Sequence, residues 1–383
     1  MRILFISHDA TRSGAPLALL QILSFVHRTC KNIEFEVLLL CGGELEGEFK
    51  KICKTHHGWS DYSFTNRILR KFCKDRIDNP FLYKFKRGSF DCIYANSVVS
   101  FKKTCKIAKK IDAPIIGHVH EAEYLMYEKG VQKDDIQSIR YFITVSELAK
   151  SNLINNYGVS PNSISIQRPV SYWVDLYMKN KVQVSKIKIN NEKNEFVIGL
   201  CANEGWCKGL DVLPLVIKDF WKKYDVANCK FVVIGYLNKG FQYKIHLELK
   251  KFGIRDNIIE FVGCVSNPLL YQKKFSVFLL ISREDSFSLS AQEAALMETP
   301  IVGFRGVTGA AEWIDDGAGL LVPYMDFDKL SDSIYYLYTH EKERIRIGKR
   351  ASEIVQESYK FDSKLTSIIH VISNCSDLKK RAL

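Results

Sequence analysis

Two carboxylates in the second half of the chain have the spacing of a ligand-binding pair. Asp285 follows an apolar run that ends at Ile281, and Glu293 lies eight residues further on, within a helical pattern. At 3.6 residues per turn the second acid is about two turns further along, so the two can approach one ligand from different ends. Carboxylates accept paired hydrogen bonds from the diol of a sugar or a ribose. The pair indicates a site for a hydroxylated ligand, although each acid by itself fits a helix cap or a surface ion pair better.

A serine-rich turn connects the apolar run to this helix. Ser286 or Ser288 is predicted to cap the helix. The N–H groups beyond such a cap, together with the positive end of the helix dipole, favour an anion. The turn therefore predicts a phosphate site next to the acidic pair.

The elements that must position these residues follow from an alternation of short apolar runs with amphipathic, helix-length stretches, which is typical of parallel strands joined by crossover helices. Predicted strands of a first sheet lie at residues 2–7, 35–40, 91–95, 115–119 and 142–145, with a first helix at 16–26. Predicted strands of a second sheet lie at residues 196–200, 231–234, 258–261, 277–281, 301–304 and 319–322, with a helical segment at 330–361. We therefore expect two α/β domains in tandem.

A polar stretch at 179–195, rich in Lys and Asn and without periodicity, is predicted to link the two domains. It divides the chain into an N-terminal domain at 1–180, a C-terminal domain at 181–360, and a helix with a charged tail at 361–383. The end of that tail, from residue 375, is expected to fray.

The composition is that of a globular protein large enough for two domains, with 383 residues of which 46% are apolar. No run of about 18 apolar residues occurs, so no membrane-spanning helix is expected. The apolar start is followed by His8 and Asp9, which favours a buried strand over a signal peptide. The eleven cysteines are odd in number, scattered and without a C-x-x-C pair. They predict reduced thiols and a cytoplasmic protein.

The chain is basic, with a formal net charge of +12 and a pI near 9.0, and much of this charge lies at 50–87 and 101–110. Basic surfaces attract nucleic acid, anionic lipid and phosphorylated small molecules alike. A solvated basic face and a peripheral position at the inner face of a membrane both fit this charge. We expect no nucleic-acid partner.

Metal chemistry is not expected. Asp326-Phe327-Asp328 has the spacing of a metal-binding D-x-D but follows the last predicted strand, so it is interpreted as a turn and helix cap. Neither zinc-ligand spacing nor a P-loop is present.

The acidic pair belongs to a longer resemblance. The run from Arg283 to Leu289, followed by Glu293-Ala294-Ala295 and Thr299-Pro300-Ile301-Val302, resembles the donor-site signature of glycosyltransferase family 4, E-x7-E followed by T-P-V-V. Asp285 stands where the first Glu is usual, and Glu298 where Gly is usual. The resemblance is most specific from residue 197 to 323. It implies a retaining, nucleotide-sugar-dependent enzyme of the GT-B fold, in which two Rossmann-like, doubly wound α/β domains face each other across a cleft.

The resemblance also implies roles for single residues. Asp285 and the backbone amides of Phe287, Ser288 and Leu289 are assigned to the hexose and the phosphates, and Glu293 to the ribose. Ser286, in the same segment, is also counted among the donor-binding residues. Lys208, followed by Gly209 in the loop after the strand at 196–200, is assigned to the donor diphosphate, where negative charge builds up as the phosphate–sugar bond breaks. Taken alone, a Lys-Gly pair is more often a solvated turn.

Other positions in the same half of the chain are compared with the family, and one of them departs from it. The Arg that the family commonly supplies near this Lys is absent, and Arg305 is the suggested substitute. Asn203, in the same loop as Lys208, is included among the donor-binding residues. Gly306 and Gly309 resemble a later donor-domain loop, where they permit close backbone approach to a ligand or simply form turns.

In the N-terminal half, Ser13-Gly14-Ala15 resembles the family's first loop, in which a small residue, here Gly14, lets donor and acceptor meet. His120 aligns with a histidine that faces the transferred sugar, and a histidine at a strand end is structural about as often as it is functional. The G-x-G-x-x-G fingerprint of dinucleotide enzymes is missing.

The expected reaction moves a hexose from a UDP- or GDP-linked sugar to a saccharide or lipid-linked saccharide acceptor, in surface polysaccharide synthesis, without a further cofactor. Lys208, Asp285 and His120 are the expected catalytic residues.

Two alternatives stay open. One is a nucleotide-sugar epimerase of the same fold. The other is a non-catalytic basic adaptor on a transferase scaffold, which the missing Arg and the unusual Glu298 favour.

Overall fold

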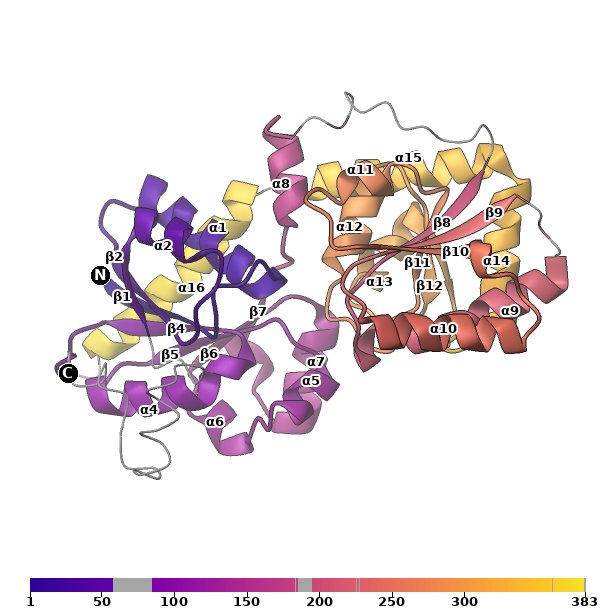
Figure 1. The fold of residues 1–383 in the computed structure, drawn as a ribbon. Helices are drawn as coiled ribbons and strands as arrows, with labels where there is room; N and C mark the ends of the chain where they lie inside the picture. Colours follow the sequence, from indigo (N-terminus) through magenta and orange to yellow (C-terminus); the bar gives the residue numbers. More distant parts are fainter. Residues whose placement is uncertain are drawn as a thin grey trace. The chain divides into compact units, whose positions relative to one another are not determined.

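A computed structural model of the chain describes residues 1–57, 85–182, 184, 195–224, 226, 228–359 and 361–381. It divides into two compact units (Figure 1). Unit 1 comprises Met1–Pro169 with Phe361–Leu383, and unit 2 comprises Val170–Lys360. The division at Pro169 comes earlier than the predicted boundary at residue 180, and the predicted linker at 179–195 lies mostly outside the described residues.

The described part of unit 1 contains a seven-stranded parallel sheet in the order β3-β2-β1-β4-β5-β6-β7. Its strands are β1 (Arg2–Ser7), β2 (Glu34–Leu39), β3 (Lys54–His57), β4 (Cys92–Asn96), β5 (Ile115–Val119), β6 (Tyr141–Thr144) and β7 (Ile164–Ile166). The five predicted strands are confirmed to within a residue or two at their ends. The two edge strands escaped prediction because β3 is polar and β7 has only three residues.

Helices cover both faces of this sheet (Figure 1). One face packs against α1 (Gly14–Thr29) and α16 (Phe361–Arg381), and the other against α4 (Phe101–Ile111), α5 (Glu123–Glu128), α6 (Lys133–Gln137) and α7 (Glu147–Tyr157). Two separate apolar clusters result, because successive residues of a strand point to opposite faces. Short α2 (Glu46–Ile52) precedes β3, and Phe49 fixes it to the first of these faces.

The end of the chain is helical and returns to unit 1. Helix α16 lies beside α1 and β4, with Leu365, Ile368, Ile372 and Cys375 buried. These positions repeat at helical spacing, as expected of a helix with one apolar face. Cys375, from which fraying is expected, is fully buried, and the helix continues to Arg381, so fraying of the residues beyond Cys375 stays a prediction.

The described part of unit 2 contains a six-stranded parallel sheet in the order β10-β9-β8-β11-β12-β13. Its strands are β8 (Phe196–Cys201), β9 (Cys229–Ile234), β10 (Ile259–Gly263), β11 (Val277–Leu280), β12 (Ile301–Phe304) and β13 (Gly319–Val322). All six match the predicted positions to within two residues at each end. Two α/β units with parallel sheets are thus present, as predicted.

The helices of unit 2 again lie on both sides of the sheet (Figure 1). Helices α9 (Leu213–Tyr224), α10 (Lys239–Lys251) and α14 (Phe327–Thr339) contribute apolar residues to the main core cluster. On the other side α12 (Leu289–Leu296) packs against α8 (Tyr172–Met178), α11 (Leu269–Gln272) and α15 (Glu341–Ser358). Asp326 accepts a hydrogen bond from the N–H of Lys329 at the start of α14, which confirms the predicted cap.

Glu298 occupies a backbone conformation that favours glycine, with φ of +61° just beyond the end of α12. The N–H of Thr299 donates to Ala294 O and that of Glu298 to Ala295 O, which is the pattern of a Schellman motif. An L-residue is strained at the left-handed position of this motif. The usual Gly at this place in family 4 therefore has a conformational explanation, and Glu298 departs from it at a cost in stability.

We expect Glu298→Gly to stabilise unit 2 by about 0.5–1 kcal/mol, because relief of the left-handed strain exceeds the added freedom of the unfolded chain. Equilibrium unfolding in urea measures this difference. Glu298→Ala is the matched control, since it removes the exposed side chain but keeps the strain, and it should not stabilise. Equal gains from both variants would assign the effect to the carboxylate instead.

Candidate active site

The strand order of unit 2 reverses between β8 and β11, since β9 and β10 continue on one side and β12 and β13 on the other. The loops after β8 and β11 therefore diverge and leave a crevice at the carboxyl ends of these strands. Ligands of open α/β sheets bind at this kind of position. Lys208 lies in the first loop and Asp285 in the second.

Lys208 ends a short 3-10 turn, η4 (Trp206–Lys208), and Gly209 follows it with φ of +66°. A Cβ at Gly209 would lie 2.0 Å from the carbonyl oxygen of Ile281, so only glycine lets this loop approach the end of β11 so closely. The Lys-Gly pair is thus a packed turn that brings the lysine against the neighbouring loop.

The ammonium of Lys208 donates to the carboxylate of Asp285, with 2.8 Å between Nζ and Oδ2. Burial disfavours the ammonium charge, but the attraction of the Asp285 carboxylate and the hydrogen bond to it outweigh burial, so the pKa of Lys208 is raised. Lys208 is therefore protonated at neutral pH and forms an ion pair with Asp285. The sequence predicted both residues, and the structure brings them into contact.

The second oxygen of Asp285 organises its own loop. Oδ1 accepts hydrogen bonds from the N–H of Phe287 at 3.2 Å and of Ser288 at 2.7 Å. The backbone of Asp285 pairs with the loop after β12, donating to Val307 O at 2.8 Å and accepting from the N–H of Gly309 at 3.0 Å. Of the three amides assigned to a ligand at 287–289, those of Phe287 and Ser288 are thus held by Asp285 itself.

Ser288 immediately precedes α12 but does not cap it with its side chain. Its φ of +52° and ψ of +79° are left-handed, whereas a capping serine has an extended backbone that directs its oxygen to the first turn. The predicted cap by Ser288 is therefore wrong, and Ser286 lies further from the helix. The Ser288 hydroxyl is buried and has no hydrogen-bond partner among the described residues. It remains available to a ligand at the helix start.

Glu293 lies inside α12 and is buried, with 7% of its surface exposed. It accepts a short hydrogen bond from the hydroxyl of Ser171, whose N–H donates to Gln292 Oε1 at 2.8 Å. Burial raises the pKa of Glu293 to about 7, against the opposing effect of hydrogen bonds from Ser171 and Gln272. Ser171 was not among the predicted site residues. It also caps α8, and a serine before Tyr172-Trp173 was the available signal.

Lys208 and Glu293, which are assigned to different ends of the donor, both lie close enough to the thiol of Cys201 to affect its pKa. The pKa of Cys201, at the end of β8, is raised to about 12, mainly by burial and also by the nearby Glu293, while Lys208 acts to lower it. Cys201, Lys208, Asp285 and Ser290 also line one cavity of about 20 Å³, which is room for no more than one water molecule. Lys208, Asp285 and Glu293 therefore belong to one neighbourhood at the carboxyl edge of the sheet.

Two predicted donor residues serve other contacts in this structure. Arg305 forms a two-pronged ion pair with Asp315 at the surface. Asn203 accepts a hydrogen bond from the N–H of Tyr236 at 2.8 Å and ties the loop after β8 to the loop after β9. Within the described residues, no hydrogen bond or ion pair joins either of them to Lys208 or Asp285. The substitution of the missing family Arg by Arg305 therefore gains no support from the geometry.

In unit 1 the corresponding reversal of strand order lies between β1 and β4. Gly14 begins α1 after β1, and His120 follows β5. The amide of Asn96 donates to Ala15 O at 2.9 Å, so its oxygen faces His120 Nε2, also at 2.9 Å. His120 must then donate from Nε2, and its Nδ1 carries no proton in the neutral ring.

Glu121 joins the segment that follows β4 and Asn96 to the segment that follows β5 and contains His120. Its carboxylate accepts hydrogen bonds from the hydroxyl of Ser97, the N–H of Val98 at 3.2 Å and the N–H of His120 at 3.0 Å. Ser97 has a φ of +78°, a strained conformation for a serine that this contact helps to hold. Glu121 is a positioning residue that sequence reasoning did not identify.

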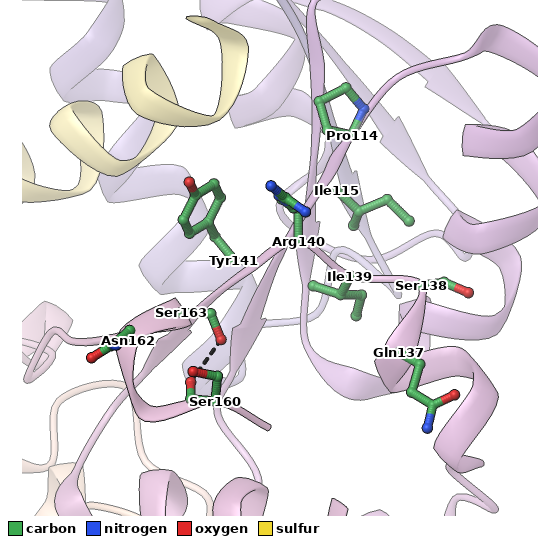
Figure 2. Close-up of a pocket in the computed structure, with 10 residues that line it drawn as sticks. All are labelled: Pro114, Ile115, Gln137, Ser138, Ile139, Arg140, Tyr141, Ser160, Asn162 and Ser163. Carbon is green, nitrogen blue, oxygen red and sulfur yellow. Dashed lines mark hydrogen bonds between the residues drawn. The ribbon is translucent and has the colours of Figure 1, made fainter. Parts of the chain in front are cut away.

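A separate hollow in unit 1, of about 590 Å³, lies at the opposite edge of the sheet (Figure 2). Pro114, Tyr141 and Ser163, which line it, stand at or just before the starts of β5, β6 and β7. Arg140 lies between them (Figure 2). None of the predicted site residues lines this hollow, so it is distinct from the candidate site.

The described residues contain no cluster of three or more His, Cys, Asp or Glu side chains that could hold a metal ion. Within the same residues no helix has both the length and the apolar character needed to span a bilayer. Each of the ten cysteines described is a free thiol.

Comparison with known protein families identifies a matching family for unit 2. Residues 182–354 match the sequence model of a family described as glycosyl transferases group 1. This part of the chain, which is nearly all of unit 2, is therefore a glycosyltransferase group 1 domain. The match assigns neither family 4 nor a retaining reaction.

Two characterised relatives are similar at low identity. The chain is 27% identical over 231 residues to the capsular polysaccharide biosynthesis glycosyltransferase CapM of Staphylococcus aureus, covering 60% of this chain and 57% of CapM. It is 23% identical over 297 residues to the O-antigen biosynthesis glycosyltransferase WclY of Escherichia coli, covering 74% of this chain and 79% of WclY. The chain thus spans little more than half the length of CapM.

Solved structures extend the likeness to the whole chain. Anabaena Alr3699/HepE in complex with UDP and glucose is similar with a TM-score of 0.74 and 17% identity, covering 98% of this chain and 100% of HepE. The lipopolysaccharide outer core galactosyltransferase WaaB is similar with a TM-score of 0.71 and 16% identity, covering 97% and 99%. Likeness at these identities establishes the fold. The predicted GT-B class, with two Rossmann-like α/β domains, is confirmed.

The buried histidines make stability depend on pH. Burial, with a further effect of His8, lowers the pKa of His120 to about 3, and burial also lowers that of His118. The unfolded chain, whose histidines titrate near pH 6.5, therefore takes up protons first as the pH falls. The stability that the neutral histidines contribute is fully present above pH 6.5. It is lost as the pH falls below 6.5, by about 1.4 kcal/mol per pH unit for His120.

We expect His120→Gln to reduce the slope of unfolding free energy against pH between about pH 6.5 and 5 by this amount. Urea unfolding at several pH values measures the slope. His27→Gln is the control, since His27 is exposed on α1, and it should leave the slope unchanged. An unaltered slope in His120→Gln would mean that His120 is charged in the folded protein.

Proposed function

We propose that the chain is a retaining glycosyltransferase of family 4 that moves a hexose from a UDP- or GDP-linked sugar to a saccharide or lipid-linked saccharide acceptor. The pathway we propose is the synthesis of a surface polysaccharide, as the names of the relatives CapM and WclY suggest. The complexes of HepE with UDP and with UDP-glucose favour a uridine donor.

The observation that carries the proposal is the Lys208–Asp285 contact at the strand-order reversal of unit 2. An ammonium group, the first turn of α12 and the unpartnered Ser288 hydroxyl lie in one neighbourhood. Helix starts bind phosphate, and a cation beside them stabilises a leaving diphosphate. We assign the diphosphate to Lys208, the Ser288 hydroxyl and the first-turn amides that begin at Leu289.

The proposed reaction breaks the bond between the anomeric carbon and the diphosphate oxygen and forms a bond from that carbon to the acceptor oxygen. The acceptor proton passes to the departing phosphate. Both events occur on one face of the sugar, so the anomeric configuration is kept. Asp285 accepts hydrogen bonds from the hexose hydroxyls, and Lys208 neutralises the charge that develops on the diphosphate.

Glu293 is assigned to the ribose of the donor. Its carboxyl group accepts a hydrogen bond from the hydroxyl of Ser171. Ribose hydroxyls then share the carboxylate with Ser171 or displace it, since a carboxylate offers about four acceptor positions. Ser171 thus supplies a hydrogen bond to a carboxyl group that burial removes from water.

His120 is assigned as a hydrogen-bond acceptor for a hydroxyl of the transferred sugar. Its pKa of about 3 keeps the ring neutral, so it serves neither as a general acid nor as a general base at neutral pH. Nδ1, the nitrogen without a proton, suits a sugar hydroxyl. Gly14 is assigned to the approach of donor and acceptor.

Replacement of Lys208 by Ala should lower kcat about 10²–10³-fold, because the leaving diphosphate loses its cation. Transfer assays with saturating donor measure kcat, and circular dichroism checks the fold. Lys208→Arg, which retains a positive charge, should recover part of the loss.

The matched control is Lys223→Ala, which breaks a surface ion pair with Asp328 and Asp332 in the same unit. It should leave kcat unchanged. A folded Lys208→Ala protein with normal turnover would remove this residue from the mechanism.

Donor affinity should rise by roughly an order of magnitude between pH 6 and 8, because Glu293 ionises near pH 7 and its carboxylate binds ribose better than the neutral acid does. Calorimetric titration with the nucleotide sugar is suitable, since its phosphates do not titrate in this range. Glu293→Gln keeps the contact with Ser171 but cannot ionise, so its affinity should be independent of pH. A slope that persists in Glu293→Gln would assign the titration to another group.

The reaction class is tested by product analysis. A screen of nucleotide sugars by thermal shift identifies the donor, and NMR of the product with a saccharide acceptor reads its anomeric configuration. A retained configuration supports the proposal, and an inverted one contradicts it. Conversion of the donor without an acceptor would indicate the epimerase instead. If no nucleotide sugar binds, the result would favour the alternative of a non-catalytic basic adaptor.

A further inference from the structure

Helix α4 of unit 1 presents an exposed face made of lysines. Lys102, Lys103, Lys106, Lys109 and Lys110 are all exposed. At 3.6 residues per turn they lie within an arc of about 120° around the helix axis. We call these five residues the lysine face. The helix itself contains no Asp or Glu.

Few acidic groups offset this charge. Among the described residues, four of these lysines, all except Lys110, form no ion pair or hydrogen bond through their side chains. Asp112, just beyond the helix, is paired with Arg87. Helix α6 supplies two acids, Asp134 and Asp135, of which Asp135 lies near Cys105, and one lysine, Lys133. The lysine face therefore keeps a strong net positive charge.

The opposite face of α4 is already used. Phe101, Cys105, Ile107, Ala108 and Ile111 are buried in the core of unit 1. An amphipathic helix that enters a bilayer needs its apolar face for the lipid. Helix α4 cannot supply one without unfolding, so its outer surface offers charge and no insertion.

We propose that the lysine face docks unit 1 on an anionic lipid surface by electrostatic attraction alone. Each lysine close to such a surface contributes, and their effects combine within the Debye length. A spread of single charges over three turns of helix matches an array of headgroups better than one small anion. This inference goes beyond the proposed function and does not depend on it.

The test is flotation with vesicles of phosphatidylcholine and phosphatidylglycerol, or of phosphatidylcholine alone, at about 0.05 M and 0.5 M NaCl. The variant is Lys102→Glu, Lys103→Glu and Lys106→Glu together. Glu and Lys have similar helix propensities, so α4 should form normally. The matched control reverses Lys239, Lys244 and Lys250 on α10 of unit 2, which are also exposed. Each reversal removes two charges, so both triple variants change the formal net charge from +12 to +6.

We expect the wild type and the α10 variant to bind anionic vesicles alike at low salt, and the α4 variant to bind at least tenfold more weakly. Binding should vanish at high salt and on neutral vesicles. Equal loss in both variants would show that net charge alone matters and would overturn the assignment to α4. Binding that survives high salt would contradict a purely electrostatic contact, and retention on heparin without vesicle binding would indicate a polymer partner. Nucleotide binding by the α4 variant, measured in parallel, reports separately on the proposed function.

Discussion

One ammonium–carboxylate contact holds together the loops at the carboxyl edge of unit 2. Lys208 comes from the loop after β8 and Asp285 from the loop after β11, and the backbone of Asp285 is bonded to the loop after β12. A buried carboxylate is costly unless a cation and hydrogen bonds compensate it. Asp285 has both, from Lys208 and from the amides of Phe287 and Ser288. The close approach permitted by Gly209 is what allows this contact to form.

Burial then decides which groups carry charge. It keeps His118 and His120 neutral, raises the pKa of Glu293 to about 7 and keeps the Cys201 thiol protonated. Lys208 is charged because its partner outweighs the same burial. The carboxyl edge of unit 2 thus holds an ammonium group paired with a carboxylate, whereas that of unit 1 holds neutral imidazole rings.

Helix α12 is bounded by two strained residues. Ser288 before it and Glu298 after it both have left-handed backbone conformations that other residues avoid. The strain at Ser288 lies beside the proposed diphosphate site, where surrounding contacts with Asp285 fix the backbone. The strain at Glu298 lies at the far end of the helix, where the Schellman hydrogen bonds fix it. The helix that carries Glu293 is therefore held at both ends by its hydrogen bonds rather than by favourable residue choice.

The sequence alone determined the two parallel α/β sheets, since apolar runs and amphipathic stretches depend only on local periodicity. It also placed Lys208 and Asp285 in loops after strands, because the carboxyl ends of parallel strands share one edge. Tertiary structure decided what each group contacts. In the folded protein Arg305 pairs with Asp315, and Glu293 accepts a hydrogen bond from Ser171. Ser288 does not cap α12, and the C-terminal helix α16 packs against unit 1. These contacts depend on burial and on residues that lie far apart in the chain. A local sequence pattern contains no information about either burial or distant partners.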